Sequence, residues 1–138
     1  MKKFLASFPQ WTFTVLWLII VAWLMVVPTK FMESLSDMVR DIDNWCHFLL
    51  TAVMVMLLCF DWQRKHKYQL LKMPGLALFW MIGFVLTAIF EILQIFIPDE
   101  YRRWFDFMDL LWQAVGGLVA ALCYSFLQLA WAKDRLSE

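Results

Sequence analysis

The chain has 138 residues, of which 63% are hydrophobic and 17% charged, and its acidic and basic residues balance to zero net charge. A soluble domain of this length needs more charged surface, so the composition excludes that class. We expect no nucleic-acid partner.

Four long apolar runs predict four transmembrane helices, at about 10–28, 44–62, 74–97 and 106–132. At a rise of about 1.5 Å per residue, runs of about 17 to 25 residues can cross a hydrocarbon core of about 30 Å. Between the first two runs, apolar residues at helical spacing predict a short amphipathic helix on the outer surface: Phe31, Leu35, Met38 and Ile42. The sequence therefore predicts an all-α integral membrane four-helix bundle, with residues 1–138 as a single transmembrane domain.

The basic residues predict the orientation of this bundle. The amino terminus, the connection after the second helix and the carboxyl tail contain 8 of the 12 lysines and arginines. By the positive-inside rule, these segments and both termini are expected to be cytoplasmic. The opposite segments hold four basic against eight acidic residues. The outer side is therefore expected to be acidic.

Three of the predicted helices carry polar residues along one face near their outer ends. At i, i+4 or i+3 spacing these residues are Asp43, His47 and Thr51, then Thr87, Glu91 and Gln94, then Asp106, Asp109 and Gln113. Counted from the helix ends, Glu91 and Gln113 lie at the same depth, about 9 Å below the outer boundary. We therefore expect one polar pocket that opens outward.

The cost of charge in a bilayer restricts where these side chains can point. A charged side chain near the bilayer centre costs about 2.5 to 3.5 kcal/mol, so Glu91 is expected to face protein or water. Gln94, Gln113 and His47 can donate hydrogen bonds, and Arg102 or Arg103 can supply a counter-charge. The opposite, inner half of the bundle is interpreted as apolar.

Small residues on the fourth helix predict close helix packing, at Gly116, Gly117, Ala120 and Ala121. The three cysteines form no CxxC or Cys/His spacing, and the sequence has no Walker-type or Rossmann glycine loop. No cofactor and no metal is therefore expected from a motif.

The polar residues resemble the pattern of the VanZ-like family, small multi-pass bacterial membrane proteins of the teicoplanin-resistance type. That pattern is Asp-x-x-x-His, then Glu-x-x-Gln, then Arg-x-x-Asp-x-x-Asp-x-x-x-Asn-x-x-Gly. The matching residues, which run from the second to the fourth helix, are Asp43 with His47, Glu91 with Gln94, and Arg103, Asp106, Asp109 and Gly116. The resemblance implies a multi-pass protein of the bacterial cytoplasmic membrane with a role in the cell envelope and in antibiotic resistance.

The sequence departs from the family pattern at three positions. Asn44 replaces the usual basic residue, Thr51 replaces an aromatic residue, and Gln113 replaces the usual asparagine. Gln113 keeps the amide and Thr51 a hydroxyl, so polarity is retained while reach and shape change.

Three functional hypotheses follow. In the first, the outer pocket recognises a membrane lipid, a lipid-linked cell-wall precursor or a lipoglycopeptide, and affects teicoplanin susceptibility. In the second, the chain is an enzyme in which carboxylates and His47 act as general acid and base, or hold a divalent metal through Asp109, Glu91 and His47. In the third, the polar residues only fix helix packing. The sequence does not separate these hypotheses and does not give the oligomeric state.

Overall fold

The structure is a computed structural model, and it describes residues 8–26, 38–66, 69–94, 96 and 107–136. In these ranges the chain forms four helices and no strand: α2 (Thr12–Val26), α4 (Met38–Lys65), α5 (Met73–Gln94) and α6 (Phe107–Leu136). The all-α prediction is confirmed. Of the expected amphipathic outer helix, residues 38–42 are the first residues of α4, and the part before Met38 lies outside the described residues.

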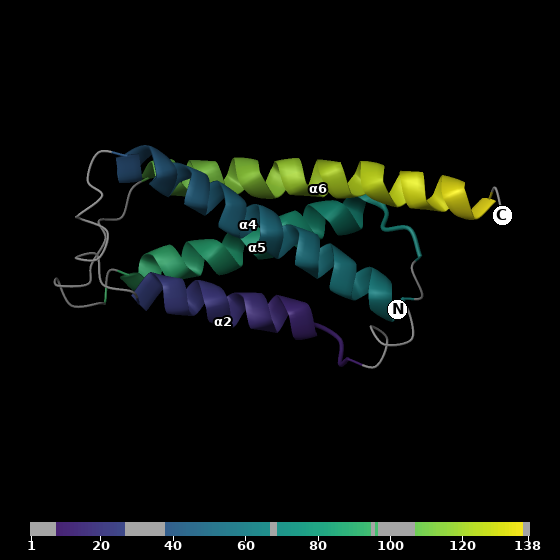
Figure 1. Cartoon of the computed structure of the whole chain (residues 1–138), viewed down its shortest axis with the longest axis horizontal. Coiled ribbons are helices and arrows are strands. Elements are labelled where there is room, and N and C mark those ends of the chain that lie inside the picture. Colours follow the sequence, from purple (N-terminus) through teal and green to yellow (C-terminus); the bar gives the residue numbers. More distant parts are fainter. Residues whose placement is uncertain (1–7, 27–37, 67–68, 95, 97–106, 137–138) are drawn as a thin grey trace.

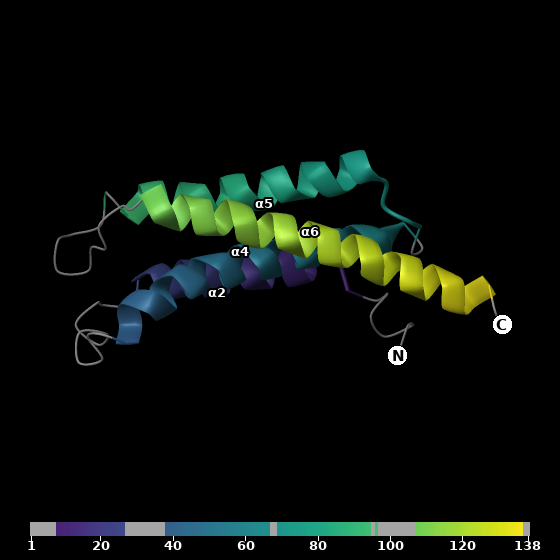
Figure 2. The same ribbon diagram turned by 90° about the horizontal axis from the view of Figure 1, so that it is seen from above.

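Successive helices run in opposite directions, so α2 begins and α6 ends at the same end of the bundle (Figures 1 and 2). We call the end where α4 and α6 begin and α5 ends the site end, and the other the opposite end. The positive-inside rule predicts that the site end faces outward.

Three of the helices are long and apolar enough to cross a membrane, over Asn44–Lys65, Met73–Leu93 and Phe107–Trp131. The other, α2, has 15 residues and rises about 22 Å. The outer surface of the described helices is apolar, with large side chains such as Trp23 and Phe126 exposed by 67% and 72%. Several polar side chains within the helices, such as Asp61 and Glu91, are buried instead, a distribution that suits lipid surroundings.

Helix α4 packs against the other three helices and contributes Met54, Val55, Leu58 and Cys59 to the hydrophobic core. Its approach to α6 is very close, because a Cβ atom added to Gly116 would overlap the carbonyl oxygen of Phe48. A Cβ on Gly117 would lie 2.8 Å from Cδ1 of Trp80 and 3.2 Å from Cγ2 of Thr51. These contacts, with the burial of Ala120 and Ala121, place the small-residue face of α6 inside the bundle.

Candidate functional site

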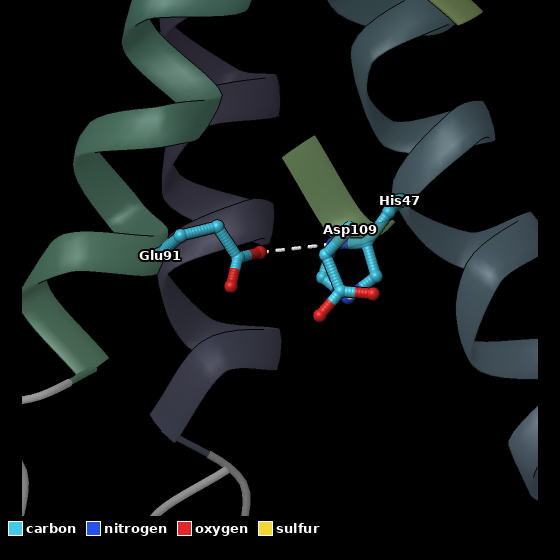
Figure 3. Close-up of side chains that lie close together, drawn as sticks. All are labelled: His47, Glu91 and Asp109. Atoms are coloured by element: carbon cyan, nitrogen blue, oxygen red, sulfur yellow. Dashed lines mark ion pairs between the residues drawn. The ribbon is translucent and has the colours of Figure 1, made fainter. Parts of the chain in front are cut away.

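Three helices each bring an ionisable side chain to one buried position near the site end. His47 comes from α4, Glu91 from α5 and Asp109 from α6, and Figure 3 shows Glu91 pointing across to the imidazole, with Asp109 beside that ring. Their exposed fractions are 3%, 1% and 7%. Together with Gln113, which is 1% exposed, they form what we call the His47 cluster.

The contacts within the His47 cluster are short. Nδ1 of His47 lies 2.9 Å from Oε1 of Glu91, and Nε2 lies 3.8 Å from Oδ1 of Asp109. The Gln113 amide Nε2 donates to Oε1 of Glu91 at 3.0 Å and lies 3.3 Å from Nδ1 of His47. One ligand atom from each ionisable residue lies within 4.8 Å of the others, so these three residues can also hold a metal ion.

The Gln113 side chain is only half satisfied. Its Nε2 has two neighbours, but its Oε1 is buried and has no hydrogen-bond partner. A buried polar atom left without a partner costs about 1 to 3 kcal/mol. The cluster therefore has a free acceptor directed away from solvent, beside two carboxylates.

A second polar layer lies next to this cluster and orients the helices that carry it. The Thr51 hydroxyl donates to Oγ1 of Thr87 at 3.1 Å, and Thr87 Oγ1 lies 3.1 Å from the carbonyl of Gly83 on its own helix. On the α5–α6 side, the indole Nε1 of Trp80 donates to the carbonyl of Ala114 at 3.0 Å. These bonds link α4, α5 and α6 in the same region as the close approach at Gly116.

Four of the eight residues predicted for the pocket meet in the His47 cluster. The hydrogen bond between Glu91 and Gln113 joins the two residues for which the sequence predicts the same depth below the outer boundary of the membrane. Asp43 and Gln94 belong to α4 and α5, but their side chains lie outside the described residues. Arg103 and Asp106 also lie outside them, so the expected counter-charge from the loop remains a prediction.

The interpretation of the inner half as apolar was wrong. Asp61 is fully buried, and its Oδ2 accepts from the backbone N–H and the hydroxyl of Thr14 at 3.0 and 2.9 Å. Oδ1 accepts from Arg64 at 3.2 Å, and the same guanidinium donates to the carbonyls of Phe8 and Pro9. We call Thr14, Asp61 and Arg64 the Asp61 cluster.

The Asp61 cluster fixes the amino-terminal end of α2. The N–H of Thr14, in the first turn of α2, has no partner within its own helix, and Asp61 supplies one from α4. Just before this helix, Trp11 has a φ of 69°, a value that is uncommon for a residue with a side chain. The second helix was predicted to end at about residue 62, whereas α4 continues to Lys65, and Arg64 in its last turn is 8% exposed.

A third set of buried polar residues, also at the opposite end, was missed by the sequence analysis. Gln128 of α6 accepts from the N–H of Leu71 and donates to its carbonyl, both at 2.9 Å. Nε2 of Gln63 donates to Oε1 of Gln128 at 2.9 Å. The Tyr124 hydroxyl donates to Oε1 of Gln63 at 2.7 Å. Because glutamines within long apolar runs have no spacing that identifies a backbone partner, the sequence could not predict this network.

The apolar exterior, the spanning helices and the buried ionisable cluster together define a helical integral membrane protein. The model of the VanZ/LLP1 family matches residues 3–128, and the chain belongs to this family. This confirms the resemblance drawn from the motifs. Comparisons with curated proteins and with solved structures gave no match.

Proposed function

We propose that the His47 cluster recognises the polar part of a lipid-linked or amphiphilic ligand, and that the protein thereby lowers susceptibility to teicoplanin-type lipoglycopeptides in the bacterial cell envelope. The observation that carries this proposal is the burial of Glu91 beside an amide whose Oε1 has no partner. Such an acceptor-rich position is suited to a ligand that brings hydrogen-bond donors or positive charge.

The composition of the cluster supports recognition over simple helix packing. Two carboxylates and one imidazole carry a net charge of at least minus one even when the imidazole is protonated. Like charges in a low-dielectric region repel, and a network that only fixes helix packing has no need of them. A bound ligand gives a reason for gathering Glu91 and Asp109 at one point.

The surroundings of the cluster support an amphiphilic ligand. The outer surfaces of α5 and α6 are apolar, so the tail of a lipid or of an acylated glycopeptide can lie against them while its polar part reaches the site end. The charge distribution predicts that the site end lies on the outer face of the cytoplasmic membrane. Membrane lipids are themselves candidate ligands.

The proposal is tested by susceptibility measurements in a teicoplanin-sensitive bacterium that expresses the chain. Wild type should raise the inhibitory concentration of teicoplanin more than that of a glycopeptide without an acyl tail. Glu91→Ala and Asp109→Ala should abolish this protection while the amount of protein in the membrane, measured by immunoblot, stays the same.

Cys123→Ala is the matched control, because Cys123 lies on the exposed side of the same helix as Asp109. It should keep full protection. Undiminished protection by Glu91→Ala and Asp109→Ala at equal membrane level, or no protection by wild type, would overturn the proposal.

An enzymatic role is the second candidate, and the 2.9 Å contact between His47 and Glu91 favours it. A carboxylate that orients an imidazole is an arrangement used for general acid–base catalysis. Turnover of a lipid or wall precursor by the purified protein, lost in His47→Ala, would establish catalysis in place of simple recognition. Binding without turnover would exclude it for that substrate.

A further inference from the structure

Three positions in the His47 cluster have the separations expected for neighbouring ligands of one metal ion. Nδ1 of His47 lies 2.9 Å from Oε1 of Glu91, and Nε2 of Gln113 lies 3.0 Å from that oxygen and 3.3 Å from Nδ1. Ligand atoms at about 2.0 to 2.2 Å from a common ion are separated by about 2.8 to 3.6 Å. One possible ligand atom of Asp109 lies within 4.8 Å of one atom of His47 and one of Glu91.

The unpaired oxygen of Gln113 is a second and independent indication of a bound group. A half-turn of the amide about its last side-chain bond exchanges Nε2 and Oε1. Oε1 would then occupy the position from which Nε2 now faces Glu91 and His47. A cation at this point would use the lone pair of a side chain that is 1% exposed and whose oxygen has no partner.

Charge also favours a cation with two positive charges. The carboxylates of Glu91 and Asp109 carry two negative charges, which a divalent ion neutralises when the imidazole is neutral. A neutral imidazole ligates through one ring nitrogen and can donate a hydrogen bond from the other, which fixes the orientation of the ring. Both ring nitrogens of His47 have a carboxylate oxygen within 3.8 Å.

We propose that the His47 cluster binds one divalent transition-metal ion of the Zn²⁺ or Mn²⁺ class, with His47, Glu91 and Asp109 as ligands and the Gln113 amide oxygen completing the set. Imidazole nitrogen combined with carboxylate and amide oxygen, without a thiolate, is a donor set for these ions, whereas Ca²⁺ and Mg²⁺ prefer oxygen alone. The site draws on three helices, so a bound ion would also join α4, α5 and α6.

One consequence rests on the proposed function. Lipid-linked wall precursors carry phosphate groups, which the negative charges of Glu91 and Asp109 would repel. A divalent ion bridges protein carboxylates and ligand phosphates. The ion would therefore make an acidic site attractive to an anionic lipid headgroup.

The test uses the full chain in detergent, treated with a chelator, desalted and titrated with Zn²⁺ alone or Mn²⁺ alone in a calorimeter. Wild type should bind one ion per chain. His47→Gln, Glu91→Gln and Asp109→Asn should each weaken binding by at least about 100-fold, beyond the 10- to 100-fold loss typical of residues that only orient a ligand.

The chain offers a matched control, because it contains two histidines. His66 is exposed at the opposite end, where it stacks on Trp62 at 4.1 Å between ring centroids. His66→Gln should bind the ion like wild type. Wild-type binding no stronger than that of His47→Gln, or loss of the site in His66→Gln, would overturn the proposal.

Two further measurements keep the test decisive if a variant fails to fold. X-ray absorption of the Zn²⁺-loaded wild type should show nitrogen and oxygen ligands, and a sulfur ligand would overturn the site. Added Zn²⁺ should also raise the unfolding temperature of wild type, and it should raise that of Gln113→Met by less. The reason is that a ligand stabilises the folded state according to its affinity.

These measurements need no lipid, so they separate this inference from the proposed function. A chain that binds the ion in the His47 cluster but gives no teicoplanin protection would overturn the proposed function alone. A chain that protects but binds no ion would overturn the cation site alone.

Discussion

The two ends of this bundle bury ionisable side chains in opposite ways. At the opposite end, one acid and one base pair with each other, and the Asp61 carboxylate accepts three hydrogen bonds from Thr14 and Arg64. At the site end, the carboxylates of Glu91 and Asp109 both lie beside the His47 imidazole, and the neighbouring Gln113 amide oxygen has no hydrogen-bond partner. In the Asp61 cluster both carboxylate oxygens accept hydrogen bonds, from donors on two helices, whereas in the His47 cluster the side-chain oxygen of Gln113 has no hydrogen-bond partner.

This difference teaches how to separate structural from functional polar residues inside a membrane. Asp61 accepts from the N–H of Thr14, one of the first-turn N–H groups that have no partner within their own helix, and Arg64 donates to the Phe8 carbonyl just before α2. Glu91, in contrast, contacts the side chains of His47 and Gln113. Stability should therefore depend on the Asp61 cluster, and ligand binding on the His47 cluster.

The largest expected effect is the loss of stability in Asp61→Ala. This change leaves the Arg64 guanidinium, which is 8% exposed, without its carboxylate, and removes the partner of the Thr14 N–H. Breaking a buried pair from one side costs about 3 to 5 kcal/mol, which unfolding in denaturant should show. Lys65→Ala, at an exposed neighbouring position, should change the free energy of unfolding by less than about 0.5 kcal/mol. Equal losses in the two variants would break the comparison.

A loss of comparable size is expected in Gln128→Leu. The change leaves the N–H and the carbonyl of Leu71 without their amide partner, at about 1 to 3 kcal/mol for each group that stays buried and unpaired. Hydrogen exchange at the Leu71 amide should become faster in this variant. The control is Gln69→Ala, which changes an exposed residue in the same segment. Unchanged exchange at Leu71 would show that Gln128 does not hold the start of α5.

Gly116→Ala should separate α4 from α6 beside His47 and destabilise the fold by about 1 to 3 kcal/mol, because the new methyl group overlaps the backbone of Phe48. Zn²⁺ binding should weaken as His47 moves from Asp109. Gly75→Ala is the control, since its methyl group meets only the Leu71 side chain, which can move. If both variants lose equal stability, the close helix approach is not what positions the cluster.

The smallest effect concerns the hydrogen bond between Thr51 and Thr87. A double-mutant cycle with Thr51→Val and Thr87→Val should give a coupling energy of about 0.6 kcal/mol, the average for such pairs in membrane bundles. Ion binding should be retained in both single variants. A coupling energy above about 2 kcal/mol would show that the Thr51–Thr87 hydrogen bond is a main source of stability, as the Asp61 cluster is expected to be.

The fold was predictable because apolar runs of spanning length leave few alternatives in a membrane. The meeting of His47, Glu91, Asp109 and Gln113 followed from helical spacing and from counting depth in two antiparallel neighbours. Helix ends were less predictable. Gln63, Arg64 and Lys65 lie beyond the predicted end of the second helix, but the buried partners of Gln63 and Arg64 keep this segment in α4.

The Asp61 and Gln128 contacts could not be predicted, because their partners are backbone groups of Phe8, Pro9 and Leu71. A backbone carbonyl or N–H has no signature in the sequence. The unpaired oxygen of Gln113 was equally invisible, since it depends on which way one amide points between two side chains. Residue types and spacing can bring polar groups together, but only coordinates show which of their atoms remain unsatisfied.

The most direct test compares the free energies of unfolding of Glu91→Gln and Asp61→Asn, measured side by side in detergent after chelator treatment. Glu91→Gln removes a repelling charge and keeps an acceptor for Gln113, so its stability should equal or exceed that of wild type. Asp61→Asn removes the buried ion pair between Asp61 and Arg64 and should be clearly less stable. Equal losses in the two variants would contradict the account, because Glu91 would then be holding the bundle together as Asp61 does.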